Sequence, residues 1–571
     1  MEKLTRRDFI KSAILGVSAA TISMSLVGCN ANSDSGMATN EFNISFNHGV
    51  ASGDPLSDSV ILWTRVTPEE AQRSVSLTLQ VAQDEAFNQL LSSQKVVALK
   101  KNDYTVKVDL DGLNENSVYY YRFVADNTYS PVGRCKTLPV NEVTHVKLAV
   151  MSCANYPAGY FHVYGEAAKR DDLDAVVHLG DYIYEYGMGG YATEQAQALG
   201  RTLDADNATE LLLLDDYRKR YAKYRTDAGL QALHAKVPFI AVWDDHEVCN
   251  DSYMGGAENH NPETEGDYSA RKLAALQAYY EWMPVRPYVV GQTESLYRKF
   301  DFGDLVSLYM LDTRHESRAK PLDYMNYVDV NSGQINLQQF QSDLVAPTQQ
   351  LLGNQQLQWL TDAMQTSQTK WQVLGQQVLM TKMNIPAELL MSLANPTPAI
   401  AAQLAELAQI KGRMLAGDPT LTEQEKARIQ FAAPYNLDAW DGYPVEREVI
   451  LQAAKGANKN LVVVAGDTHN AWAGKLCNAK GDVCGYEFAT ASVSSPGLEY
   501  YLQLPEAQAM QVAEVLKLLV DDLEFANIHQ RGFMTLTFTR DNVENEWNFI
   551  DSVHTEQFNV VSAISTQVAK A

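Results

Sequence analysis

The sequence contains few cysteines and no excess of positive charge. Only 6 cysteines occur in 571 residues, so the chain is not a small scaffold held together by disulfides. Lys and Arg total 46 against 70 Asp and Glu, and the net charge of −24 opposes nucleic-acid binding. A turn-forming segment separates Cys477 from Cys484, which favours a hairpin disulfide in an oxidising compartment.

The sequence also lacks an apolar run long enough to span a membrane. Residues 13–27 form a short apolar segment, and no later stretch approaches the length of a membrane span. The preceding pair Arg6-Arg7 resembles a twin-arginine export signal, and Leu26-Val27-Gly28-Cys29 resembles a lipoprotein cleavage box. An ordinary secretory signal is the alternative. We predict an exported protein, periplasmic or at the cell surface, that uses the twin-arginine machinery and meets a membrane only through lipid on Cys29.

The composition divides the chain into a signal, a tether and two domains. Residues 1–29 are the signal, and residues 30–41, rich in Ser, Asn, Asp and Gly, are a flexible tether. Short alternating or β-branched runs in residues 42–139 predict an N-terminal β-sandwich domain. In residues 140–571, buried apolar runs alternate with amphipathic stretches, which is typical of a layered α/β domain. Its Ala- and Leu-rich stretch at about residues 383–433 predicts a helical insertion.

Residues that can bind metals or anions follow five predicted strands of the α/β domain. The carboxyl ends of strands in α/β folds gather at one rim, so we expect these side chains to converge. Each residue alone could be a helix cap, a core residue or a hydrogen-bonded histidine. Five such strand ends together favour a functional site. The residues are Cys153, Asp181, Tyr184, Asp244, Asp245, His246, Arg314, Asp467 and His469.

The types of these residues predict two unlike metal sites. Thiolate and phenolate favour a trivalent or soft transition metal, whereas carboxylate and amide oxygens favour calcium, magnesium or manganese. Asp181 and Tyr184 stand three apart and can reach one ion, and the carboxylate can bridge to a second. Asp467 and His469 alternate, so in an extended segment both point the same way.

Three motifs resemble those of the purple acid phosphatases. Gly180-Asp181-x-x-Tyr184 is similar to GDxxY, and Asp245-His246-Glu247 is similar to GNH(E/D) with Asp in place of Asn. Gly466-Asp467-x-His469 is similar to GHxH with Asp in place of the first His, and Cys153 stands where the first strand normally offers an Asp. The second metal site thus exchanges nitrogen for oxygen ligands, which shifts its preference toward calcium.

With these departures, the sequence resembles the PhoD-type alkaline phosphatase/phosphodiesterases over nearly its whole length. This resemblance implies an α/β fold, the αββα four-layer metallophosphoesterase sandwich, with an N-terminal all-β sandwich domain. It implies one Fe³⁺ and one or two Ca²⁺, and activity at alkaline pH. The implied iron ligands are Cys153, Asp181, Tyr184 and His469; the implied calcium ligands are Asp181, Asn250 and Asp467, with Asp245 as the alternative to Asn250.

Two further residues are expected to act on the substrate. The resemblance implies that His246 protonates or stabilises the leaving alkoxide. Arg314 follows a predicted strand and could neutralise phosphoryl charge through a bidentate contact, although an ordinary ion pair with a carboxylate is the alternative.

Together these features predict an exported hydrolase that releases phosphate from small monoesters, diesters or both. The alternatives are a phospholipase D-like diesterase specific for lipids or polymers, and a non-catalytic surface-binding protein. Strand-end motifs do not separate the ester classes, because loops build the leaving-group pocket.

Overall fold

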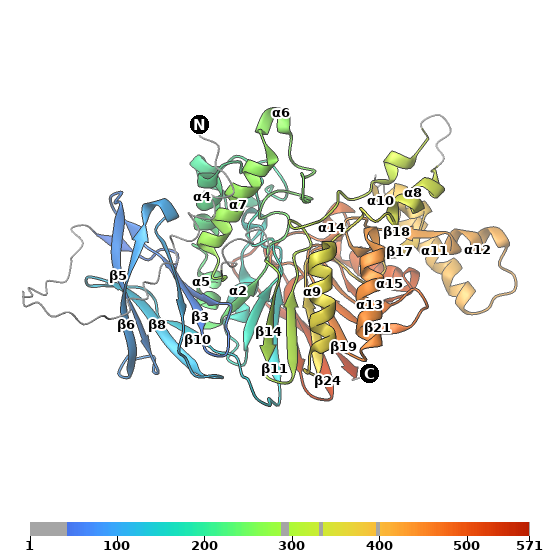
Figure 1. Cartoon of the computed structure of the whole chain (residues 1–571). Coiled ribbons are helices and arrows are strands. Elements are labelled where there is room, and N and C mark those ends of the chain that lie inside the picture. Colours follow the sequence, from blue (N-terminus) through green and yellow to red (C-terminus); the bar gives the residue numbers. More distant parts are fainter. Residues whose placement is uncertain (1–42, 287–295, 330–334, 395–399, 570–571) are drawn as a thin grey trace, which may run out of the picture.

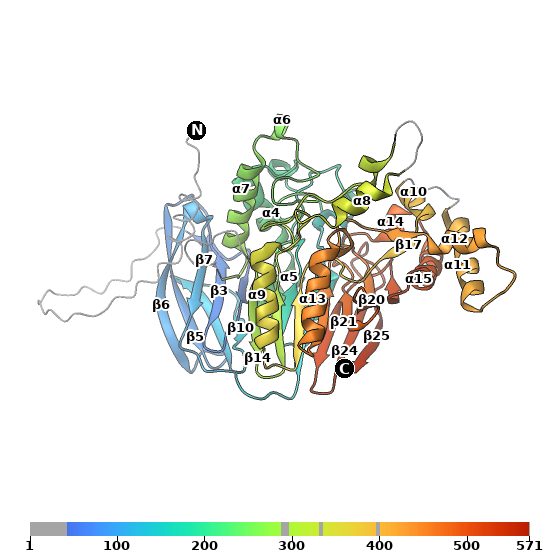
Figure 2. The ribbon, with the colours of Figure 1, turned by 45° about the vertical axis from the view of Figure 1, so that its right-hand side comes forward.

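Two large β-sheets lie face to face, and helices cover their outer faces (Figures 1 and 2). This computed structural model describes residues 43–286, 296–329, 335–394 and 400–569. The expected export signal and tether lie outside these residues. Within the described ranges, no helix combines the length and apolar character needed to cross a bilayer.

Four adjacent strands of the nine-stranded sheet are parallel, and three of them form its centre. β11, β12 and β13 run parallel, so all three end at the same edge of the sheet. Helices α2 (His162–Ala167), α4 (Leu214–Tyr224), α5 (Ala228–Lys236) and α7 (Tyr268–Trp282) belong to this half of the molecule. The strand order is β25 (Val560–Ala569), β24 (Asn542–Ile550), β23 (Arg531–Phe538), β11 (Val146–Met151), β12 (Ala175–His178), β13 (Phe239–Ala241), β2 (Val50–Gly53), β3 (Val60–Arg65) and β7 (Thr105–Leu110).

The seven-stranded sheet is buried on both faces. Along β19, Val462 and Val464 enter the core between the sheets, whereas Leu461 and Val463 pack toward helices α9 (Gly353–Thr366) and α13 (Pro444–Gly456). This alternation follows from the two-residue period of a strand. The order is β14 (Arg298–Phe302), β15 (Val306–Met310), β16 (Trp371–Gly375), β19 (Asn460–Ala465), β21 (Val483–Ala489), β20 (Ala471–Cys477) and β22 (Leu523–Asn527). The predicted αββα architecture is therefore confirmed.

The N-terminal region forms the predicted all-β sandwich around a core of its own, which includes Leu62, Leu79 and Phe123. One layer contains β5 (Ser74–Ala82), β6 (Leu90–Leu99), β8 (Val118–Ala125), β9 (Thr128–Tyr129) and β10 (Gly133–Lys136). The other layer consists of β2, β3 and β7, which continue the nine-stranded sheet because β2 pairs with β13. β1 (Ile44–Ser45) pairs with β4 (Thr67–Pro68) beside it. The sandwich and the α/β domain thus share one sheet.

Residues 384–394 and 400–434 form a helical segment that projects from one end of the molecule (Figure 1). Its ends are joined by antiparallel pairing of β17 (Asn384–Pro386) with β18 (Ala432–Pro434). Between them lie α10 (Glu388–Ala394), α11 (Ile400–Leu415) and α12 (Glu423–Gln430), and α11 packs on α15 (Glu506–Leu519). The remaining helices are α3 (Ala196–Leu199), α6 (Pro262–Glu265), α8 (Leu337–Leu344) and α14 (Leu498–Tyr501).

The expected disulfide between Cys477 and Cys484 is wrong, since both cysteines are free. A β-bulge between Leu476 and Cys477 places Val483, rather than Cys484, opposite Cys477. The thiol of Cys484 donates a hydrogen bond to the carbonyl of Asp482 at 3.4 Å.

Candidate metal centre

Candidate metal ligands from three strand ends meet at one rim of the two sheets. Cys153 follows β11, Asp181 follows β12 and His469 follows β19; their donor atoms lie within 4.8 Å of one another. Two further groups of this kind adjoin the first and share members with one another. They are Asp181, Asp245 and His246, and Asp244, Asp245 and Asp467.

Four of these residues have a left-handed backbone. The φ angles are 63° at Cys153, 53° at Asp181, 62° at Asp467 and 63° at His469. Non-glycine residues seldom adopt this conformation, and tertiary structure must hold them in it. Strained backbone at several candidate ligands is typical of a site whose geometry serves a function.

Gly180 allows two ligand-bearing loops to touch. Its φ is 104°, and a Cβ atom added there would lie 2.3 Å from the backbone nitrogen of Asp244. Only glycine permits both this backbone conformation and this approach. The loop that carries Asp181 is therefore in backbone contact with the loop that carries Asp244 and Asp245.

The hydroxyl of Tyr184 lies between Asp181 of the nine-stranded sheet and His469 of the seven-stranded sheet. It donates to Asp181 Oδ2 at 3.0 Å, accepts from Ser495 Oγ at 2.8 Å and lies 3.0 Å from His469 Nε2. Burial, together with the charge of Asp181, raises the pKa of Tyr184 and that of Cys153 well above their usual values. Both groups therefore hold their protons until a cation displaces them.

His469 presents a neutral ring nitrogen to this group. Burial lowers the pKa of His469 to about 3, so the imidazole is uncharged at neutral pH. Its Nδ1 donates to the carbonyl of Pro496 at 2.8 Å, which leaves Nε2 toward Tyr184. Metal-binding histidines are commonly oriented in this way by a carbonyl on the opposite nitrogen.

Arg314 is fully buried and lies among the carboxylates. Its Nε donates to Asp244 at 2.5 Å, its Nη1 to Asp438 at 2.8 Å and its Nη2 to Asp467 at 2.7 Å. All three guanidinium nitrogens thus contact protein carboxylates. The structure therefore places Arg314 as an organiser of the carboxylate cluster, and its contact with a phosphoryl group stays a prediction.

Two buried carboxylate oxygens indicate that these residues fit a metal ion. Among the described residues, Asp181 Oδ1 and Asp244 Oδ2 have no hydrogen-bond partner. A buried carboxylate oxygen without a donor is unfavourable, and a bound cation would satisfy it. Sulfur, phenol, imidazole and carboxylate donors around these atoms suit cations of both kinds predicted from the sequence.

His246 is held by a buried carboxylate. Its Nδ1 donates to Glu185 Oε2 at 2.7 Å, and its ring stacks on Tyr184 with centroids 4.1 Å apart. Burial alone would lower the pKa of His246, but Asp245, Glu185 and Asp181 together raise it well above the usual value. His246 is therefore charged and can donate a proton.

Asp245 and Asn250, the two alternative calcium ligands, have different surroundings. Asp245 belongs to two of the candidate groups, whereas the side-chain amide of Asn250 donates to Glu258 at 2.8 Å. The backbone nitrogen of Asn250 donates to Glu185 Oε1 at 2.8 Å. The bond to Glu258 uses Nδ2, so it does not occupy Oδ1, the Asn250 atom that would bind calcium, and both residues stay candidates.

No role was predicted from the sequence for Glu185 or Glu247, and Asp244 was expected only as one of the strand-end residues. Glu185 and Glu247 directly follow Tyr184 and His246, so adjacency to a motif was the only available signal. Both carboxylates are fully buried and bind groups of the site. Asp244 is a member of the oxygen-rich group.

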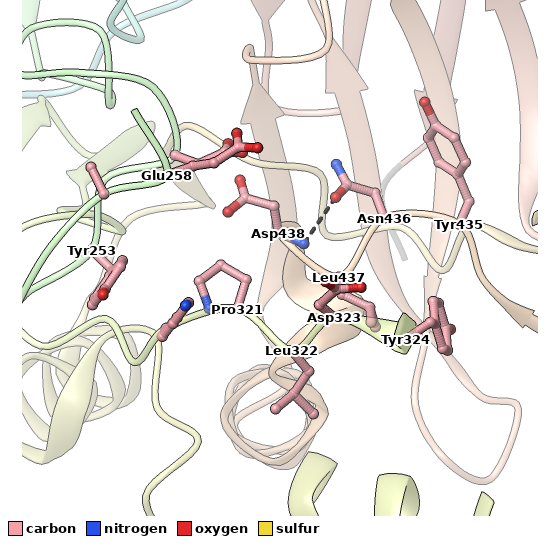
Figure 3. A pocket seen from close by; sticks show the side chains of 13 residues that line it. Tyr253, Glu258, Pro321, Leu322, Asp323, Tyr324, Tyr435, Asn436, Leu437 and Asp438 are labelled. Atoms are coloured by element: carbon pink, nitrogen blue, oxygen red, sulfur yellow. Dashed lines mark hydrogen bonds between the residues drawn. The ribbon is translucent and has the colours of Figure 1, made fainter. Parts of the chain in front are cut away.

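A cavity of about 510 Å³ adjoins the oxygen-rich side of the centre (Figure 3). Asp438, which binds Arg314, lines it together with Asn436. The same segment contributes Tyr435, and other loops contribute Glu258 and Asp323. Loops from distant parts of the chain thus form the wall beside the rim.

Comparisons with known proteins indicate the same family over most of the chain. The model of the PhoD-like phosphatase family matches residues 148–547, and that of the PhoD-like phosphatase N-terminal domain matches residues 30–139. Alkaline phosphatase D of Bacillus subtilis (strain 168) is 35% identical over 510 residues, which cover 86% of this chain and 76% of that protein. A solved structure of PhoD is 32% identical, covers 92% of this chain and 90% of its own, and superposes with a TM-score of 0.72.

Proposed function

Because this chain belongs to the PhoD-like phosphatase family, it is a phosphoric ester hydrolase, and we propose that it cleaves small phosphate monoesters and diesters outside the cytoplasm at a centre of Fe³⁺ and Ca²⁺. The convergence of Cys153, Asp181, Tyr184 and His469 carries this proposal. No ordinary structural role requires a thiol, a phenol, a carboxylate and an imidazole to share one buried point with three of them in left-handed backbone.

Iron and calcium would occupy different parts of the centre. Cys153, Asp181, Tyr184 and His469 would hold iron, because phenolate and thiolate suit a trivalent ion. Asp181 and Asp467 would hold calcium together with Asn250 or Asp245, and Asp244 is a further oxygen donor beside them. When bound, the cations would lower the proton affinity of a water molecule and offset negative charge on the phosphoryl group.

His246 would supply the proton for the leaving oxygen. Glu185 fixes Nδ1, and stacking on Tyr184 fixes the ring plane, so Nε2 is the nitrogen available to an ester. The carboxylate of Glu185, bonded to Nδ1, favours the protonated imidazole and raises the pKa of His246. General acid catalysis of this kind contributes roughly 10²–10⁴-fold to a rate.

Elemental analysis and a visible spectrum of the purified protein test the metal assignment. We expect iron and calcium in the same protein and an absorption band in the visible, since tyrosinate or thiolate bound to ferric iron absorbs there. Calcium chelation should abolish turnover, and added calcium should restore it. Full activity in excess chelator, or a colourless protein without iron, contradicts the assignment.

Two model substrates test the reaction. Nitrophenyl phosphate reports monoester hydrolysis, and bis-nitrophenyl phosphate reports diester hydrolysis. Turnover of only the diester would favour the phospholipase D-like alternative. A metal-loaded protein that cleaves neither ester would support the non-catalytic alternative.

Export through the twin-arginine pathway is part of the proposal and rests on Arg6-Arg7 and the segment that follows. Replacement of both arginines by lysine should retain the protein in the cytoplasm, as judged by cell fractionation. Cys29→Ala should abolish labelling by a lipid precursor. Unchanged fractionation and labelling in these variants would contradict export by this route and lipidation.

A further inference from the structure

Glu247 joins the two loops that carry the candidate ligands of the nine-stranded sheet. Its Oε2 accepts the backbone N–H of Asp181 at 3.0 Å and that of Asp244 at 2.7 Å. Its Oε1 accepts the backbone N–H of Tyr182 at 2.6 Å. The side chain is fully buried, so these amides have no water to replace the carboxylate.

The two loops need such a tie because their own conformations do not hold them together. Asp181 has a φ of 53°, and its neighbour Gly180 has a φ of 104°. The loop after β13 approaches so closely that Gly180 has no room for a side chain against Asp244. Three amides that point at one carboxylate offset the cost of this arrangement.

We propose that Glu247 is a positioning residue that sets the distance between the loop that carries Asp181 and the loop that carries Asp244 and Asp245. It thereby holds candidate ligands of both loops at the spacing that the metal centre requires. This inference rests on the proposed function, since Asp181 and Asp245 are the candidate ligands that would contact the cations. Glu247 itself has both carboxylate oxygens occupied by backbone amides and so does not contact the substrate. A carboxylate is required because three donors need two acceptor oxygens, and an amide offers only one.

The same device elsewhere in the chain provides a matched control. Glu446 is also buried, and its carboxylate accepts the backbone N–H groups of Leu351, Leu352 and Gly353. These amides lie at the start of α9, away from the candidate ligands. Glu446→Gln therefore reproduces the local damage of Glu247→Gln without touching the centre.

The experiment compares full-length Glu247→Gln with Glu446→Gln. We expect similar losses of thermal stability in both variants. Only Glu247→Gln should lose bound iron and calcium by elemental analysis, shift the visible band, and lower kcat by tenfold or more with a smaller change in KM. Wild-type metal content, spectrum and kcat in folded Glu247→Gln would overturn the proposal, as would equal losses in Glu446→Gln.

Hydrogen exchange separates this inference from the proposed function. Peptides that contain Asp181, Tyr182 and Asp244 should exchange faster in Glu247→Gln, and not in Glu446→Gln, whether or not the wild-type protein contains metal. Unchanged exchange there would overturn the positioning role. A metal-free wild-type protein with this exchange pattern would refute only the proposed metal centre. If Glu247→Gln does not fold, the shorter Glu247→Asp is measured instead, and a wild-type spectrum and kcat in that variant would overturn the proposal.

Discussion

The Nδ1 atom of His246 donates to Glu185 Oε2 at 2.7 Å, and both side chains are buried. Burial would raise the pKa of Glu185, but the charge of His246 and its hydrogen bond hold the pKa below the usual value. The pair therefore consists of an imidazolium and a carboxylate at neutral pH. This charge distribution is what a proton donor to a leaving oxygen requires.

Glu185→Gln should move the alkaline limb of the activity profile to lower pH. The carboxylate of Glu185 is one of the groups that raise the pKa of His246, so its loss lowers that pKa. The protonated donor then disappears at a lower pH. We expect kcat/KM at alkaline pH to fall roughly ten- to hundredfold. An unchanged pH–rate profile would contradict the proton-donor role of His246.

Tyr184→Phe should remove or shift the visible absorption band, because the phenol is a candidate iron ligand. The variant also loses contacts to Asp181 and His469, and we expect kcat to fall by roughly a hundredfold or more. Tyr164→Phe is the control, since its buried hydroxyl hydrogen-bonds His178 rather than a candidate ligand. An identical spectrum in Tyr184→Phe would exclude Tyr184 as a ligand.

Arg314→Met should destabilise the protein by about 3–5 kcal/mol, because it leaves the buried carboxylate of Asp244 and the partly buried carboxylate of Asp467 without their guanidinium partner. Denaturant unfolding measures this free energy. Arg413→Met, which breaks solvent-exposed pairs with Asp418 and Glu425, should lower the free energy of unfolding much less, because solvent screens these pairs. Equal effects would show that Arg314 does not organise the carboxylates.

Arg225→Met should lower activity, because Arg225 links the N-terminal sandwich to the loop that carries Asp181. The Arg225 guanidinium lies over the ring of Trp63 on β3 at 4.3 Å, and its Nη1 donates to the Tyr182 hydroxyl at 3.2 Å. We expect kcat to fall roughly three- to thirtyfold. Arg122→Met removes a similar contact, with Phe87 at 4.1 Å, and should leave kcat unchanged. Wild-type kcat in Arg225→Met would refute the coupling.

Local sequence features predicted a layered α/β domain and an N-terminal β-sandwich, whereas the αββα arrangement was implied by the family resemblance. Five apolar runs that end in polar residues form β11, β12, β13, β15 and β19. The carboxyl ends of such strands lie at one rim of the fold, independently of the conformation of the loops. The alternating runs before residue 139 likewise predicted the N-terminal sandwich. Its merger with the larger sheet was missed, because the pairing of Gly53 with Phe239 joins residues far apart in the chain.

The sequence by itself determined the layered fold and the chemical types of the candidate ligands, because strand periodicity and motif spacing are local properties of the chain. Only the tertiary structure decided which side chains share a point. In the folded chain, the side-chain amide of Asn250 donates to Glu258, Arg314 donates to carboxylates, and Glu247 accepts backbone amides from two ligand-bearing loops. The physical reason is that hydrogen-bond partners of buried groups come from distant segments, and only folding selects which donors and acceptors meet.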